Sequence, residues 1–137
     1  MGYTDKELQI TFQDTLHRDF FLQCLQKCGS TDVRHMTLFY CLGISPDIRK
    51  QIESIYDFHT GKVQTGCLLA GCFSGSCEKA LRLAFSLYMD ALPAADEDMD
   101  TEEKLEESRL YAAHNLFDCE YAGYFWQALQ IRYPEYC

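Results

Sequence analysis

Apolar residues recur at helical spacing along most of the chain. Over residues 8–28 they return every three or four positions, as they do along one face of an α-helix, and Thr4 with Glu7 matches an N-terminal capping box. These features predict a first helix over roughly residues 5–28, ended by Gly29.

The same spacing predicts five further helices. They are expected over residues 33–42, 46–56, 77–92, 101–117 and 121–133. Residues suited to N-caps precede several of them: "STD" at 30–32, Ser45 before Pro46, Ser76, and Asp100, which forms a second capping box with Glu103. Pro93 and Pro134 are expected to end two of the helices, because proline cannot continue a helical hydrogen-bond ladder.

One segment breaks the helical period. The stretch "DFHTGKVQTG" at 57–66 places Gly61 at a turn and Val63 among polar residues, so a short strand pair or an extended loop is expected there and nowhere else. The sequence therefore predicts a mainly α fold. We expect a single domain over residues 1–137, a bundle of five to six helices with at most a small β-hairpin around residues 57–72, and an acidic linker at 93–101.

Composition fits one domain and argues against two classes of partner. With 137 residues and 47% hydrophobic content the chain can bury a core, and no apolar run approaches the roughly 20 residues that cross a bilayer. The N-terminus "MGYTDKELQ" is polar, unlike a signal peptide, so we expect a cytosolic protein with no membrane partner. Lys and Arg number 12 against 21 Asp and Glu, which disfavours direct binding of nucleic acid.

Negative charge is concentrated in one place. Residues 96–107, the acidic block, carry eight acidic residues and one lysine, a local charge of −7 within a total of −9, which leaves −2 for the remainder (−9 + 7). Such a block complements a basic surface on a protein that handles nucleic acid, although acidic runs are also often only solvated loops. The candidate partner-binding residues are Asp96, Glu97, Asp98, Asp100, Glu102, Glu103, Glu106 and Glu107.

Eight cysteines raise the question of a metal site. In "GCLLAGCFSGSC" at 66–77, Cys67, Cys72 and Cys77 lie five residues apart, and Cys28 is a candidate fourth ligand for zinc. The spacing is looser than that of zinc fingers, so small buried thiols are the alternative, and Cys77 at a helix N-terminus is also a candidate reactive thiol. No C-x-x-C, no oxyanion-hole pattern and no P-loop lysine accompanies them, so the sequence supports no enzyme assignment.

Several segments resemble a known family. "LFYCLGISPDIRKQIESIYDF" at 38–58, "ALRLAFSLYMD" at 80–90 and the closing "NLF" and "ALQIRYPEY" are similar to a small uncharacterised domain family of Firmicutes and their phages, whose members read close to "ALIRLAFNLYN" in the central helix. The likeness covers about two thirds of the chain, and the departures are Cys67, Cys72 and the acidic insertion at 94–107. The family has no assigned activity. The resemblance implies a phage or mobile-element protein in the cytoplasm of a bacterial host.

These observations favour two hypotheses. The first is a non-enzymatic protein that inhibits a host defence factor in the manner of an anti-CRISPR protein, with its acidic surface blocking nucleic-acid binding by a nuclease effector. The alternative is a metal- or thiol-dependent regulatory domain with a structural zinc site.

Overall fold

A computed structural model describes residues 2–69, 72–73, 75–90 and 100–136, except for the side chains of Cys67 and Leu69. The helices are α1 (Thr15–Cys28), α2 (Val33–Leu42), α3 (Pro46–Lys50), α4 (Ile52–Ile55), α5 (Gly66–Leu69), α6 (Gly75–Met89), α7 (Thr101–Arg109), α8 (Ala113–Leu116) and α9 (Ala122–Arg132), with a final 3₁₀ turn at Pro134–Tyr136. Four short strands form two antiparallel pairs, β1 (Tyr3–Asp5) with β2 (Ile10–Phe12) and β3 (Tyr56–Asp57) with β4 (Lys62–Val63).

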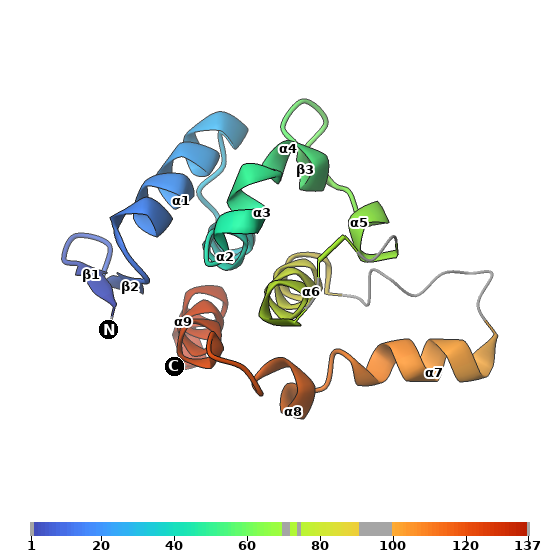
Figure 1. The fold of residues 1–137 in the computed structure, drawn as a ribbon. Helices are drawn as coiled ribbons and strands as arrows, with labels where there is room; N and C mark the ends of the chain where they lie inside the picture. The colour runs from blue at the N-terminus through green and yellow to red at the C-terminus, as the bar shows by residue number, and fades with distance from the viewer. Residues whose placement is uncertain (1, 70–71, 74, 91–99, 137) are drawn as a thin grey trace.

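Helix α2 is the centre of the core. Its last six residues, 37–42, are all buried. Because six consecutive residues point to every side of a helix, other elements must cover this part of α2 on all sides. It packs against α1, α6 and α9, and Figure 1 views α2, α6 and α9 nearly end-on, side by side. The mainly α fold with a small hairpin in the 57–72 region is therefore confirmed.

The prediction of a helix starting near residue 5 is wrong, and so is the expectation that strands occur only in the 57–66 segment. Strands β1 and β2 pair as a hairpin there, with Ile10 and Phe12 buried on one side of β2 in the two-residue period of a strand. Asp5 shapes the turn, because its Oδ1 accepts hydrogen bonds from the backbone N–H of Glu7 and of Leu8, both at 3.0 Å. Helix α1 begins only at Thr15.

Asp14 sets that later start. Its side chain accepts a hydrogen bond from the backbone N–H of His17, at 2.9 Å, which is the usual action of an N-cap. Arg18 then joins the helix to the hairpin, since its Nε lies 2.6 Å from Asp5 Oδ2. At the other end the helix stops at Gly29, as predicted, in the left-handed conformation (φ 71°).

Other boundaries differ in detail. The predicted helix 46–56 is two short helices interrupted at Gln51, and the predicted helix 101–117 is divided into α7 and α8. Helix α6 begins at Gly75, so Ser76 is not its N-cap. The Ser76 Oγ instead donates a hydrogen bond to Glu120 Oε2 at 2.6 Å.

The end of α6 also comes earlier than expected. It stops at Met89, followed by Asp90 at φ 54°, while Pro93 and most of the predicted acidic linker, residues 93–99, lie outside the described residues. Of the linker's last two residues, Asp100 caps α7 and Thr101 begins it. In the part of the chain that the structure describes, no helix has the length and apolar character needed to cross a bilayer.

Candidate functional site

The acidic block lies partly on α7. Asp96, Glu97 and Asp98 fall outside the described residues, and Asp100 accepts a hydrogen bond from the backbone N–H of Glu103 at 2.8 Å. Since residues three and four apart share one side of a helix, the four glutamates lie together on α7. With Leu110 they line an open hollow of about 620 Å³, and we call this surface the acidic face: Glu102, Glu103, Glu106, Glu107 and Leu110.

A buried arginine of α6, Arg82, links α7 to the rest of the molecule. No residue of α7 is buried, and Figure 1 shows the helix at the outer edge of the fold. Arg82 of α6, only 4% exposed, forms ion pairs with Glu107 and with Glu78, and its guanidinium lies 5.2 Å from the ring centre of Tyr111. Burial acts against the charge of Arg82, but its hydrogen bonds with the two carboxylates outweigh burial and raise its pKa above the ordinary value.

This arrangement divides the acidic face into two parts. Glu107 is mostly covered and neutralised by Arg82, so it holds α7 in place rather than presenting charge to a partner. Glu106 is exposed and pairs with Arg109 on the surface, an interaction of small energy. Glu102 and Glu103 are exposed as well. Within the acidic face, Glu102, Glu103 and Glu106 are therefore the carboxylates that are exposed to solvent.

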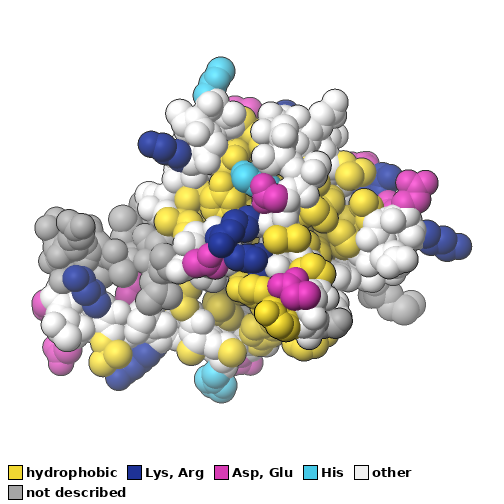
Figure 2. Space-filling view, turned by 180° about the vertical axis from the view of Figure 1, so that it is seen from behind, with side chains coloured by type: hydrophobic (Ala, Val, Ile, Leu, Met, Phe, Trp, Pro, Cys, Tyr) yellow, Lys and Arg dark blue, Asp and Glu magenta, His cyan; other side chains and the backbone are white. Residues whose placement is uncertain are grey.

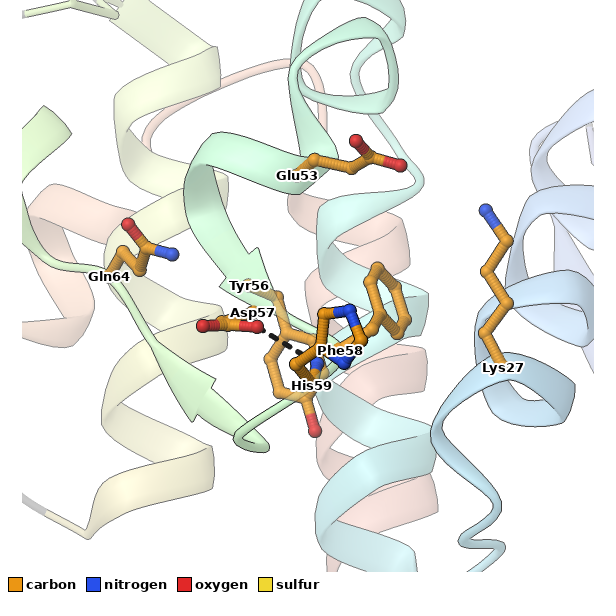
Figure 3. A pocket seen from close by; sticks show the side chains of 7 residues that line it. All are labelled: Lys27, Glu53, Tyr56, Asp57, Phe58, His59 and Gln64. Carbon is orange, nitrogen blue, oxygen red and sulfur yellow. Dashed lines mark hydrogen bonds between the residues drawn. The ribbon is translucent and has the colours of Figure 1, made fainter.

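A second hollow lies beside the β3–β4 hairpin. It has a volume of about 710 Å³ and brings together residues from α1, α4 and the hairpin (Figure 3). We call it the aromatic hollow; its lining residues are Lys27, Glu53, Tyr56, Asp57, Phe58, His59 and Gln64.

Phe58 forms the middle of the aromatic hollow. Its ring is stacked on Phe39 at 5.9 Å between centroids, meets the ring of Tyr56 edge to face at 4.9 Å, and lies 5.5 Å from Lys27 Nζ. The Asp57 carboxylate accepts a hydrogen bond from the backbone N–H of His59 at 2.8 Å. This contact stabilises the turn between β3 and β4. Burial raises the pKa of Tyr56 to about 12, which keeps its hydroxyl protonated at neutral pH. These contacts suit a binding surface better than acid–base chemistry.

A polar network that sequence reasoning did not find joins the start of α2 to the end of α6. The Nδ1 of His35 lies 2.9 Å from Asp32 Oδ2, and its Nε2 lies 3.2 Å from the hydroxyl of Tyr88. Only the spacing of Asp32 and His35 was visible in the sequence, because Tyr88 comes from a distant segment.

The candidate zinc ligands are spread through the fold. Cys28 donates to the backbone O of Leu25 at 3.4 Å and lies near enough to Tyr88 to affect its pKa. Cys77 is in the first turn of α6, with its Sγ 3.0 Å from Ser45 Oγ, so about eleven residues of helix, or roughly 16 Å, separate it from the end of α6 near Cys28.

The structure thus does not bring Cys28 and Cys77 together. Cys72 is exposed between α5 and α6, and the side chain of Cys67 lies outside the described residues. Among the side chains that are described, no three of Cys, His, Asp or Glu gather as metal ligands. A zinc site built on Cys67 and Cys72 remains a prediction, and metal analysis of the purified protein would test it.

Comparison with known proteins gives one match. The model of a protein family of unknown function matches residues 7–137. No curated protein and no solved structure matches the chain.

Proposed function

The chain belongs to DUF6075, a family of unknown function, and we propose that it is a non-enzymatic binding protein whose acidic face occupies a basic surface of another protein. The observation that carries this proposal is the placement of Glu102, Glu103 and Glu106 on an exposed helix that is fixed in position by a buried ion pair. A partner then meets these charges without having to order the helix first, which reduces the entropic cost of binding.

The chemistry of the acidic face defines the kind of partner. Three reachable carboxylates surround a hollow that also contains the apolar side of Leu110, so lysine or arginine side chains with their apolar stems fit both features. By contrast, Figure 2 shows the back of the molecule with hydrophobic side chains across its middle and basic and acidic side chains mixed among them. Among the described residues drawn in Figure 2, side chains of the two charge signs lie next to each other across the middle of this face.

The more specific form of the proposal concerns host defence. Basic grooves that bind DNA or RNA are the surfaces to which a row of carboxylates is most complementary. In the cytoplasm of a bacterial host, a phage-borne protein of this kind would inhibit a nuclease effector by covering its nucleic-acid-binding groove, as an anti-CRISPR protein does. The resemblance of residues 38–58 and 80–90 to phage-associated domains motivates this form.

A charge-matched pair of variants tests the proposal. In one, Glu102, Glu103 and Glu106 are replaced by Gln, while Glu107 is kept because it pairs with Arg82. In the control, three exposed glutamates elsewhere are replaced by Gln: Glu7, Glu120 and Glu135. Both variants have a net charge of −6 (−9 + 3), so they differ only in where the charge is removed.

The measurement uses the heparin-binding proteins of a bacterial lysate, a fraction enriched in basic nucleic-acid-binding surfaces, followed by purified RNA-guided nuclease effectors. We expect the wild type and the control to bind a component of this fraction and to reduce its binding to nucleic acid. We expect the α7 variant to bind it about tenfold more weakly, since each lost exposed charge contact contributes up to about 1 kcal/mol. Equal binding by the two variants, or a complex that leaves nucleic-acid binding unchanged, would refute the proposal.

A further inference from the structure

The aromatic hollow has a floor that packing holds in place. The half-buried ring of Phe58 is stacked on Phe39, which is fully buried, and meets the ring of Tyr56, which is only 2% exposed. The turn after Phe58 is fixed as well, because the Asp57 carboxylate accepts hydrogen bonds from two backbone N–H groups of the turn, at 2.8 and 3.3 Å. The hollow is therefore preformed, which lowers the entropic cost of binding a small molecule there.

Two side chains of opposite charge line the hollow without a charged partner. Lys27 comes from the last turn of α1 and Glu53 from α4, and both are exposed. Within the part of the chain that the structure describes, neither of them forms an ion pair or a side-chain hydrogen bond, and Lys27 Nζ instead lies 5.5 Å from the centre of the Phe58 ring. In Figure 3 the two side chains extend toward the same space, next to this ring. An ammonium and a carboxylate are thus both available to a ligand in the hollow.

This combination fits a zwitterion that has an apolar body. The Lys27 ammonium attracts a carboxylate and the Glu53 carboxylate attracts an ammonium, so together they favour a ligand that has both groups. The Phe58 ring offers an apolar surface beside them, and a second aromatic ring packs well against such a surface edge to face or offset. We propose that the aromatic hollow binds a free aromatic α-amino acid, with its carboxylate at Lys27, its ammonium at Glu53 and its side chain against Phe58.

A ligand with a single charge sign fits the hollow less well. An anion such as a nucleotide would face the carboxylates of Glu53 and Asp57, and a simple cation would have to displace Lys27 from the Phe58 ring. Tyr56 adds no charge, because burial raises its pKa to about 12 and its hydroxyl stays protonated at neutral pH. Of the two carboxylates, Glu53 is the one that can bind an ammonium, since Asp57 already stabilises the turn.

Three related molecules test the proposal by nuclear magnetic resonance. The first is L-phenylalanine, the second is N-acetyl-L-phenylalanine, which has no ammonium, and the third is L-phenylalaninamide, which has no carboxylate. We expect L-phenylalanine to shift the backbone amides of residues 56–64 in a saturable way. Each of the other two molecules should bind about fivefold more weakly, as expected for the loss of one solvent-exposed charge contact.

Variants of the two charged residues then assign each preference to one side chain. In Lys27→Met, which keeps an apolar stem, we expect L-phenylalanine and its amide to bind equally well. In Glu53→Gln, L-phenylalanine and its N-acetyl derivative should bind equally well. The matched controls are Lys50→Met and Glu135→Gln, two exposed residues outside the hollow, and both should keep the two preferences of the wild type.

Two outcomes would overturn the inference. The first is the absence of a saturable shift with L-phenylalanine up to its solubility limit. The second is a preference for the zwitterion that survives in Lys27→Met and in Glu53→Gln. An α-helical circular dichroism spectrum in each variant confirms that lost binding is not caused by unfolding. None of these measurements involves the acidic face, so their failure would leave the proposed function untouched.

Discussion

The protonation of one buried histidine should control the stability of this fold in mild acid. His17 is fully buried in α1, where its Nε2 donates to the backbone O of Tyr40 at 2.7 Å and its Nδ1 accepts from the backbone N–H of Gln13 at 3.0 Å. Both ring nitrogens are thus satisfied in the neutral form. Burial lowers the pKa of His17 from 6.5 to about 4, against the opposing hydrogen bond with Tyr40.

The size and sign of the effect follow from these two values. Below pH 6.5 the unfolded chain takes up a proton at this histidine and the folded chain does not, so protonation favours the unfolded state. The stabilisation is therefore fully present above about pH 6.5 and is lost as the pH falls toward 4. Since one pKa unit corresponds to about 1.4 kcal/mol, the loss is about 3 kcal/mol, a large part of a typical domain stability of about 5–15 kcal/mol.

Urea unfolding followed by circular dichroism at a series of pH values measures this loss. The carboxylates with lowered pKa, such as Asp5, release their stabilisation mainly below pH 4, so the range between pH 4 and 6.5 isolates His17. His17→Gln keeps one donor and one acceptor, and we expect a variant that is less stable at pH 7 but almost insensitive to pH in this range. In the wild type, the proton signals of the His17 ring should show no titration above about pH 5. A ring that titrates near 6.5, or a wild-type stability that is flat from pH 7 to pH 4.5, would refute the reasoning.

Three further changes probe other contacts. Arg82→Met leaves Glu107 mostly covered and without its cation, so we expect the free energy of unfolding in urea to fall by about 3 kcal/mol and limited proteolysis to cut near α7; a loss under about 1 kcal/mol would contradict the role of the ion pair. Gly43→Ala places a methyl group 2.8 Å from ring atoms of His17 and of Phe20, and should lower the melting temperature through a loss of about 1–3 kcal/mol, whereas Gly123→Ala in α9 meets no atom within 4 Å and should leave it unchanged or higher. Gly29→Ala puts a side chain at φ 71° and should cost about 1 kcal/mol in the same thermal assay, and an unchanged melting temperature would show that α1 does not need a left-handed end.

Features that depend on neighbouring residues could be read from the sequence. Asp32, Ser45 and Asp100 each cap a helix as predicted, because a cap involves a side chain and a backbone N–H only three residues away. Gly29 ends α1 for a similarly local reason. The break near residue 57 was visible because the apolar period changes there.

Features that depend on distant residues could not be read in this way. Apolar residues 8–28 fit a helical period, but Asp5 also closes a turn and pairs with Arg18, and this tertiary contact favours a hairpin. Glu107 lies 25 residues from Arg82, and His35 lies 53 residues from Tyr88, separations that no periodicity reveals. The sequence contains one sign of a buried ion pair, which is Arg82 within the apolar helix "ALRLAFSLYMD". Its position predicts that the arginine is buried, but it does not identify Glu107 as the partner.

The buried pair between Arg82 and Glu107 gives the molecule two separate responses to ionic strength. Salt weakens interactions between exposed charges, whose screening length falls from about 30 Å at 0.01 M to about 8 Å at 0.15 M, but it has little effect on charges that are shielded from solvent. Raising the salt concentration should therefore release whatever binds Glu102, Glu103 and Glu106 while α7 keeps its position. The ion pair that holds the acidic helix should thus survive the salt concentration at which a partner of the proposed kind would dissociate, so the protein should stay folded and bind again when the salt is removed.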